Sequence, residues 1–332
     1  MPVHGIEPEA PDGTGEGVER AAHVERGDRH EHAYRRRKAQ HERKASSTRC
    51  SVSTETSSPN STRALAISRT YRPLPATATL GDAGTSSTKA RAGEFIDTNV
   101  YGAYVMLEAT RQVNRGARFL QVGTDEVYGD VPFPEFPNEQ AMLAPSSPYS
   151  AAKAGADHIA LAFHRTHQMD VIVSRCTNNY GPNQYPEKVI PVFVTNALDG
   201  EPLPLYDGGT QVRDWLRVED HCRALLLLLR RGVAGEIYNI GANQTPEVTN
   251  RELTRLILDC TGRPETLIRP VTGLRPGHDH RYAVDTAKVR ALGWRPAEDL
   301  AAGIARTVAW YRENRAWWEP IKSGEYRDYY QK

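Results

Sequence analysis

Residues 118–123 have the sequence RFLQVG, a short apolar run that is typical of a buried β-strand. Before this run, residues 94–109 place apolar side chains at helical spacing, and residues 147–167 do so after it. Residues 171–176, VIVSRC, form a second apolar run of the same kind. Helices that alternate with short apolar strands are typical of a parallel sheet with crossover helices. The sequence therefore predicts the α/β fold class, with organised structure from about residue 93 onward.

The pattern becomes mixed after residue 179. We expect helices near residues 190–198, 250–260 and 300–314, and short strands at residues 203–206 and 237–240. Such a mixture is typical of a smaller lobe that is added to a parallel sheet. We therefore expect residues 93–180 to form the sheet domain and residues 181–332 to form mostly a smaller mixed α/β lobe.

Residues 1–92 differ in composition from the rest of the chain. Only 26 of these 92 residues are apolar, about 28%, against 39% for the whole chain, and none is Phe or Trp. A segment with so few apolar side chains cannot offset the entropy lost on ordering. We expect residues 1–92 to be disordered.

Charge and cysteine content limit the class of protein. Lys plus Arg number 42 and Asp plus Glu number 41, so there is no general attraction to nucleic acid or to an anionic membrane. The four cysteines, Cys50, Cys176, Cys222 and Cys260, form no CxxC pair, which indicates neither a zinc site nor a disulfide framework. No apolar run approaches the roughly 20 residues needed to span a bilayer. We expect a cytoplasmic protein without a metal and without nucleic-acid or membrane partners.

Two groups of residues carry the chemistry. Thr124, Asp125 and Glu126 directly follow the first predicted strand, and ligands bind at the carboxyl ends of strands in open α/β sheets. Adjacent carboxyl groups can act as acid and base if one stays protonated. Tyr149 and Lys153 stand four apart on a predicted helix, so an ammonium can lie beside a phenol and favour its ionised form. Each signal alone is common on protein surfaces, but in this order they support one another.

From about residue 93 the sequence resembles the extended short-chain dehydrogenase/reductases, and within them the dTDP-glucose 4,6-dehydratase family. The stretches that carry the resemblance are TDEVYG at Thr124, SSPYSAAK at Ser146, RCTNNYGPNQYPEKVIP at Arg175, LDGEPLPLY at Leu198, QVRDWLRVEDH at Gln211, GEIYNIG at Gly235, RPGHDHRYAVD at Arg275 and ALGWRP at Ala291. Related epimerases usually lack the Asp-Glu couple after the threonine, and decarboxylases usually carry Ser-Glu there. The resemblance implies a Rossmann-like parallel sheet, NAD as cofactor and a homodimer.

The resemblance also implies a hydro-lyase reaction that converts dTDP-glucose to dTDP-4-keto-6-deoxyglucose. Tyr149, ionised with the help of Lys153 and the positive nicotinamide, would take the proton of the 4-hydroxyl while a hydride passes from carbon 4 to NAD. Glu126 would then remove the proton on carbon 5, Asp125 would protonate the departing 6-hydroxyl, and the hydride would return to carbon 6. Thr124 would hydrogen-bond near the 4-hydroxyl.

The family pattern implies the rest of the site. At the cofactor it places Thr98, Tyr149, Lys153 and Asn179. Around the nucleotide-sugar it places Thr124, Asn178, Lys188, Val189, Pro204, Tyr206, Arg213, Asn250, Arg275 and His278. Arginine suits a diphosphate because its guanidinium offers paired donors to phosphate oxygens. Other roles stay open: Arg213 could pair with Asp214 or Glu219, Lys188 could be a solvated surface group, and Asn178 could cap a turn.

The family opens with a strand and a GxxGxxG motif at a helix N-terminus, where backbone amides hold the pyrophosphate. Residues 1–92 contain no such motif. The run from Gly13 to Gly17 has the wrong spacing and follows Pro11 and Asp12 instead of an apolar strand. Because the family has a segment of similar length at this place, we interpret residues 1–92 as an out-of-frame translation of the dinucleotide-binding half.

Two other readings stay open at this point. One is a UDP-sugar decarboxylase or epimerase, and the other is a non-catalytic binding protein in which a basic N-terminal arm replaced the cofactor half. The sequence does not distinguish a thymidine from a uridine nucleotide, nor does it identify the deoxysugar pathway.

Overall fold

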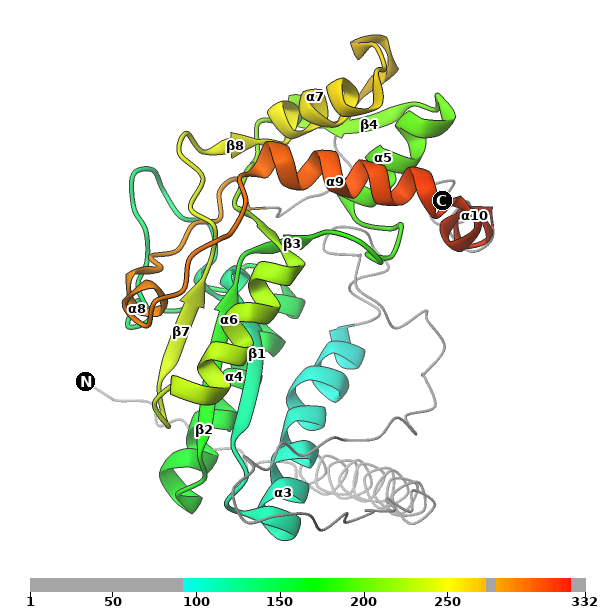
Figure 1. The fold of residues 1–332 in the computed structure, drawn as a ribbon. Helices are drawn as coiled ribbons and strands as arrows, with labels where there is room; N and C mark the ends of the chain where they lie inside the picture. Colours follow the sequence, from blue (N-terminus) through cyan, green and yellow to red (C-terminus); the bar gives the residue numbers. More distant parts are fainter. Residues whose placement is uncertain (1–91, 273–278, 324–332) are drawn as a thin grey trace, which may run out of the picture. The chain divides into compact units, whose positions relative to one another are not determined.

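The computed structural model describes residues 92–272 and 279–323, all of which belong to one compact unit of the chain (Figure 1). Residues 1–91, 273–278 and 324–332 lie outside the described residues. The expectation of disorder for residues 1–92 therefore remains a prediction, apart from residue 92, which is helical. No helix in the described ranges has the length and apolar character needed to cross a membrane.

A three-stranded parallel sheet forms the centre of the first half of the described chain. Its strands are β1 (Phe119–Thr124), β2 (Val171–Cys176) and β7 (Ile237–Ile240), in the order β1-β2-β7. Phe119 pairs with Val171, and Val173 pairs with Ile237. The predicted strands at 118–123 and 171–176 are thus confirmed to within one residue. β7 lies after residue 180, where we expected the lobe. It nevertheless belongs to the central sheet, because it pairs with β2.

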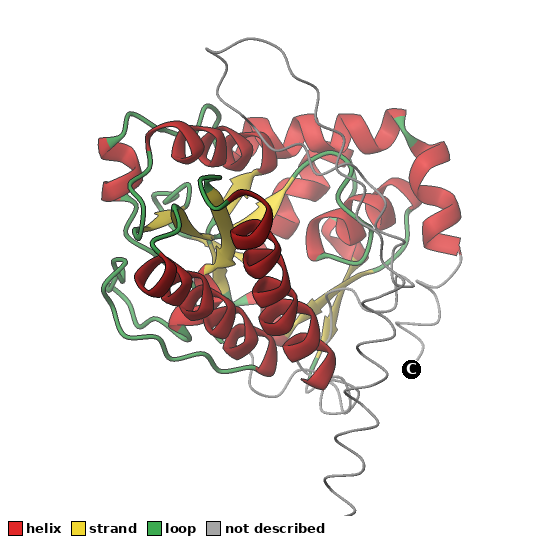
Figure 2. Cartoon of the chain, turned by 90° about the horizontal axis from the view of Figure 1, so that it is seen from below, coloured by secondary structure: helices red, strands yellow, loops and turns green. Residues whose placement is uncertain are grey.

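Helices cover both faces of this sheet. Alternate residues of a strand point to opposite faces. Val171 and Val173 pack in one apolar cluster with residues of α3 (Gly102–Asn114) and α4 (Pro148–His167). Ile172 packs in another cluster with residues of α6 (Val218–Arg231). Figure 2 shows helices around the strands. The sequence reasoning did not anticipate α6, but α3, α4 and α6 complete the layers expected of a crossover α/β sheet.

Local capping sets the start of α4. The Ser147 hydroxyl accepts a hydrogen bond from the backbone N–H of Ser150, whose side chain reaches back to the backbone of Ser147. Pro148 then occupies the first turn, where its missing N–H leaves nothing unsatisfied. The helix ends where Gln168 adopts a left-handed conformation with φ 54°. The predicted helix at 147–167 is therefore confirmed, whereas the one predicted at 94–109 is divided into the π-helical η2 (Ile96–Tyr101) and α3.

The lobe is built from short strand pairs and three longer helices. β3 (Asn178–Tyr180) pairs in parallel with β6 (Trp215–Arg217), and β4 (Leu203–Tyr206) pairs in parallel with β9 (Ile268–Val271). β5 (Val212–Arg213) and β8 (Val248–Thr249) are antiparallel. The helices are α5 (Val189–Asp199), α7 (Asn250–Thr261) and α9 (Leu300–Glu313), followed by α10 (Arg315–Ser323). The short elements are η3 (Asp125–Tyr128), η4 (Asp207–Gly209), η5 (Glu265–Leu267) and α8 (Ala287–Ala291).

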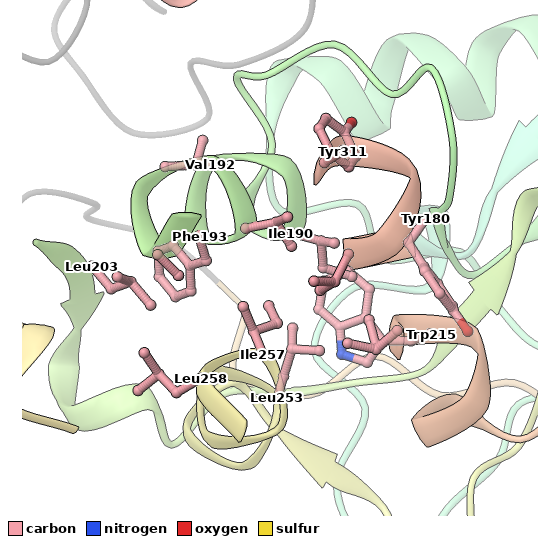
Figure 3. Packing of buried hydrophobic residues seen from close by; sticks show 14 of the residues in the cluster. Tyr180, Ile190, Val192, Phe193, Leu203, Trp215, Leu253, Ile257, Leu258 and Tyr311 are labelled. Carbon is pink, nitrogen blue, oxygen red and sulfur yellow. The ribbon is translucent and has the colours of Figure 1, made fainter. Parts of the chain in front are cut away.

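The core of the lobe lies between α5, α7 and α9. Figure 3 shows Phe193 of α5 and Ile257 of α7 directed toward one another, with Trp215 of β6 beside them. Leu253, Ile257 and Tyr311 are fully buried in this cluster. Burial of a large apolar side chain contributes about 1.5–3 kcal/mol, so the cluster holds the lobe helices against the end of β6.

Candidate active site

A cavity of about 440 Å³ lies at the carboxyl ends of β1 and β2. Its other walls come from α5, β4, β6 and the start of α7. This is the edge of a parallel sheet at which ligands bind in open α/β folds. The predicted site residues that line the cavity are Thr124, Asp125, Glu126, Tyr149, Asn178, Asn179, Lys188, Val189, Pro204, Tyr206, Arg213 and Asn250.

Two described residues of the predicted set do not line the cavity. Thr98 is exposed in η2. Lys153 lies beside the cavity, where its ammonium donates a hydrogen bond of 2.6 Å to the carbonyl oxygen of Val122. Arg275 and His278 lie outside the described residues, so their roles remain predictions.

The single-turn helix η3 presents the carboxyl pair. Thr124 stands before it in extended conformation, and its hydroxyl accepts a hydrogen bond of 3.4 Å from the backbone N–H of Glu126. The same hydroxyl donates to Oδ1 of Asp125 over 3.2 Å. Asp125 is only 3% exposed, whereas Glu126 is half-buried. The end of β1 and this cap therefore direct two neighbouring carboxyl groups into one cavity.

The two carboxyl groups lie in one cavity, but their pKa values are affected by different neighbours. Burial, followed by the charges of Glu126 and Asp214, raises the pKa of Asp125 to about 8. Burial also raises the pKa of Glu126, but Arg213 and Lys188 oppose that rise. Asp125 is therefore protonated at neutral pH and can donate a proton, while the nearby cations favour the ionised form of Glu126.

Burial dominates the environment of Tyr149 in this structure. Burial, Glu126 and Cys176 raise the pKa of Tyr149, in that order of effect. Lys153 was expected to favour the phenolate, but its ammonium binds the Val122 carbonyl and burial lowers its own pKa. The phenol is therefore neutral in this structure, and its ionisation requires a further positive charge in the site.

Arg213 forms a fixed cation in the cavity wall. It is 5% exposed, and its Nη1 and Nη2 donate to the backbone carbonyls of His280 and Asp279 over 3.0 and 2.8 Å. Its guanidinium carbon lies 4.2 Å from the ring centroid of Tyr282. Glu219, one of the alternative partners considered for Arg213, forms an ion pair with Arg217 at 2.9 Å. These contacts orient the guanidinium before any ligand binds.

Several buried polar atoms around the cavity have no hydrogen-bond partner within the described residues. They belong to Asp125, Thr177, Asn178, Asn179, Gln184, Trp215 and Asn250. Buried polar atoms in folded proteins nearly always have partners, so such a group around one cavity indicates a site for a polar ligand. The Oδ1 atom of Asn178 is among them. Because this oxygen has no partner within the described residues, it does not cap a turn.

The described residues fit only one end of a dinucleotide. Asn179 and Tyr149 line the cavity beside the carboxyl ends of β1 and β2, and the Oδ1 atom of Asn179 has no partner within the described residues. The full sequence contains no GxxGxxG motif for the pyrophosphate.

Sequence reasoning missed part of the cavity wall. Ser146, Gln211, Trp215, Asp279 and Tyr282 also line it. The hydroxyls of Ser146 and Tyr282 both donate to Oδ2 of Asp279, which joins the start of α4 to the segment after residue 278. All five lie in stretches that carried the family resemblance, but only the tertiary contacts identify them individually.

Comparison with known proteins identifies the family of the chain. A family model described as GDP-mannose 4,6 dehydratase matches residues 85–307. A dTDP-glucose 4,6-dehydratase of Streptomyces antibioticus is 52% identical over 231 residues, which are 69% of this chain and 68% of that protein.

Two solved structures of dTDP-glucose 4,6-dehydratases are each 48% identical to the chain. The enzyme of Bacillus anthracis, in complex with NAD, has a TM-score of 0.65 over 69% of this chain and 72% of that one. The enzyme of Streptomyces venezuelae, with NAD and dTDP bound, has a TM-score of 0.68 over 74% of each chain. The chain therefore has a Rossmann-like α/β fold and belongs to the GDP-mannose 4,6 dehydratase family, among the relatives of the dTDP-glucose 4,6-dehydratases.

Proposed function

We propose that this chain is an NAD-dependent dTDP-glucose 4,6-dehydratase, which converts dTDP-glucose to dTDP-4-keto-6-deoxyglucose and water. The observation that carries the proposal is the unequal carboxyl pair. Asp125, with its pKa raised to about 8, and Glu126, close to Arg213 and Lys188, line the same cavity as Tyr149. Loss of water across two carbons needs one group that gives a proton and one that takes a proton.

The roles follow from these protonation states. Tyr149 takes the proton of the 4-hydroxyl as carbon 4 becomes a ketone, and this ketone acidifies the proton on carbon 5. Glu126 takes that proton and gives it back to carbon 5 when carbon 6 is reduced, and Asp125 gives its own proton to the 6-hydroxyl, which leaves as water. NAD, when bound, supplies the acceptor and the later donor of the hydride, and its positive ring is the charge that the neutral Tyr149 requires.

Other residues bind and orient the two ligands. Lys153 and Asn179 would hold the nicotinamide side of NAD, and Arg213 would bind the diphosphate of the substrate through its oriented guanidinium. Thr124 would contact the hexose. The remaining residues proposed around the nucleotide-sugar are Asn178, Lys188, Val189, Pro204, Tyr206 and Asn250. Thr98, Arg275 and His278 remain predictions.

We further propose that the protein is a homodimer through α3 and α4. Tyr101, Tyr104, Val105 and Met106, at the end of η2 and the start of α3, are each at least 42% exposed. Tyr104 lies edge-on to Phe163 of α4, with 6.2 Å between ring centroids. A group of exposed aromatic and apolar side chains on two packed helices is typical of a protein interface. The cytoplasmic location and the absence of a nucleic-acid partner remain predictions from the sequence.

Purified chain, NAD and dTDP-glucose provide the test of the reaction. We expect a product 18 Da lighter than the substrate, with a carbonyl at carbon 4, by mass spectrometry and NMR, and we expect Asp125→Asn to abolish it. Turnover of UDP-glucose or UDP-glucuronic acid instead would favour a decarboxylase or epimerase. Binding of dTDP without NAD binding or turnover would identify a non-catalytic binding protein and contradict the proposal.

We also infer that residues 1–92 are an out-of-frame translation of a dinucleotide-binding half, that residues 93–180 carry the catalytic part and that residues 181–332 form mostly the nucleotide-sugar lobe. The absence of GxxGxxG from a chain whose family model begins to match only at residue 85 supports this inference. Translation of the gene in its other two frames is the test. If neither frame encodes a GxxGxxG motif upstream of residue 93, the inference is wrong.

A further inference from the structure

A buried ion pair lies behind the active-site cavity. Nε of Arg175, on β2, donates to Oδ2 of Asp157, on α4, over 2.9 Å. The two side chains are 2% and 0% exposed, and neither lines the cavity. Taking two charges out of water offsets most of their attraction, so a pair like this is weak evidence of added stability. The segments that the ion pair joins therefore indicate its role better than its contribution to stability does.

One of these segments is the helical turn that carries the carboxyl pair. Nη1 of Arg175 donates to the phenol oxygen of Tyr128 over 2.9 Å, and the guanidinium lies 5.1 Å from the ring centroid. The phenol in turn donates to Oδ1 of Asn239, on β7, over 2.9 Å. Tyr128 is the last residue of η3 and is 5% exposed. The C-terminal end of the turn is thereby tied to the ion pair and to the sheet.

The other end of the turn lies against the same ion pair. Gly123 directly precedes Thr124, and a Cβ atom there would stand 2.9 Å from Oδ1 of Asp157 and 2.7 Å from the carbonyl oxygen of Ser174. Both distances are too short for a side chain, so the Asp157 carboxylate occupies the space beside this backbone. The turn therefore lies against one pair of charges at both ends, through the hydrogen bond of Tyr128 at one end and through the close approach of the Asp157 carboxylate to Gly123 at the other.

We propose that Asp157, Arg175 and Tyr128 are positioning residues that hold the turn of Asp125 and Glu126 in place and so keep Asp125 shielded from water. This inference deepens the proposed function and rests on it for the role of Asp125 as the acid. The three residues act through the turn, because none of them lines the cavity. We call them the brace.

The brace determines how far water reaches Asp125. Burial is the largest cause of its raised pKa, ahead of the charges of Glu126 and Asp214, and Thr124 and Arg213 act in the opposite direction. Cys176 and Tyr149 also lie near enough to be coupled to Asp125. Glu126 belongs to the turn and Thr124 directly precedes it, so both move with Asp125. The other groups stand on β2, β5, α4 and the chain after β5, and none of the groups is removed when the brace is altered. Loosening the turn therefore changes mainly the burial, and the pKa of Asp125 falls toward its ordinary value.

The test is the pKa of Asp125 in the full chain, measured by carbon-13 NMR of labelled aspartate carboxyls without cofactor or substrate. Asp125→Asn assigns the signal. Tyr128→Phe removes only the bridging hydroxyl, and we expect the pKa of Asp125 to fall by about one unit or more. Tyr238→Phe is the matched control. This tyrosine is also buried, 2% exposed, but its hydroxyl accepts a hydrogen bond from the backbone N–H of Val233, away from the turn. The control leaves the pKa unchanged.

A second variant covers the case in which Tyr128→Phe does not fold. Asp157→Leu combined with Arg175→Met replaces the ion pair with apolar side chains, a change that buried pairs often tolerate, and the pKa of Asp125 should fall here too. An unchanged pKa in the variant that folds overturns the inference, as does an Asp125 that titrates near its ordinary pKa in the unaltered chain. A chain that fails to convert dTDP-glucose but shows the fall would reject the proposed function and support the brace.

Discussion

Replacing Arg175 with methionine leaves the Asp157 carboxylate in the protein interior without its cation. The two side chains are 2% and 0% exposed, so solvent screening does not reduce the effect. Breaking a buried pair by removing one partner destabilises a protein by about 3–5 kcal/mol, whereas replacing both partners with apolar side chains is often neutral. We therefore expect Arg175→Met to lower the free energy of unfolding by about 3–5 kcal/mol, and the double variant with Asp157→Leu to recover most of that loss.

The loss of unfolding free energy caused by Arg175→Met should also depend on pH. In the intact chain burial already raises the pKa of Asp157, and Arg175 is the main group that opposes this rise. Without Arg175 the folded chain holds a proton on Asp157 at pH values where the unfolded chain has released it. A folded state that binds more protons is stabilised as pH falls. The loss is therefore smallest near the ordinary pKa of the carboxyl, 3.8, and grows as pH rises.

The assay is urea unfolding of the full chain, followed by tryptophan fluorescence at several pH values. Arg255→Met is the control. Arg255 forms an ion pair of similar length, 3.0 Å, with Glu265, but these two side chains are 48% and 58% exposed. Exposed pairs contribute about 0–1 kcal/mol, so this change should have little effect at any pH. If Arg175→Met costs no more than this control, or if the double variant is less stable than the single one, the reasoning on the buried pair is wrong.

Three further predictions concern the cavity and its surroundings. Gly123→Ala should lower the free energy of unfolding by about 1–3 kcal/mol, because its Cβ would stand 2.7 Å from the carbonyl oxygen of Ser174, whereas Gly116→Ala, with its nearest atom at 3.7 Å, should not destabilise; equal effects in chemical denaturation would contradict this. In NAD-loaded enzyme, kcat should fall as pH rises above about 8, since Asp125 must be protonated to act as the acid, and a flat profile up to pH 10 would argue against this role. Thr98→Ala should raise the KM for NAD and leave kcat nearly unchanged, because the family resemblance places this exposed threonine at the cofactor. An unchanged KM for NAD would remove Thr98 from the cofactor site.

The elements that sequence reasoning found are those with local signals. The strands at 118–123 and 171–176 are uninterrupted apolar runs, and α4 begins at a capping box of Ser147 and Ser150 and carries Pro148 in its first turn. By contrast, β5 and β8 have two residues each, which is too short for any periodicity. The place of β7 beside β2 depends on a pairing across about 60 residues of sequence, and no local pattern encodes that choice.

The candidate site divides in the same way. The order of Thr124, Asp125, Glu126 and Tyr149 along strand, turn and helix indicated acid–base chemistry, because parallel strands bring their carboxyl ends to one edge. Spacing alone also suggested that Lys153 ionises Tyr149. That suggestion stays a prediction, since without a cofactor the pKa of the phenol is raised by burial and by the acids around it.

By itself, then, the sequence determined the alternation of strands and helices, the residue types at the strand ends and the family to which they belong. Only the tertiary structure placed Asp125 where burial raises its pKa, oriented Arg213 by backbone carbonyls, and brought Asp157 and Arg175 against the turn that carries the carboxyl pair. The physical reason is range: apolar periodicity and capping act within a few residues, whereas desolvation and charge coupling depend on which distant segments meet in space.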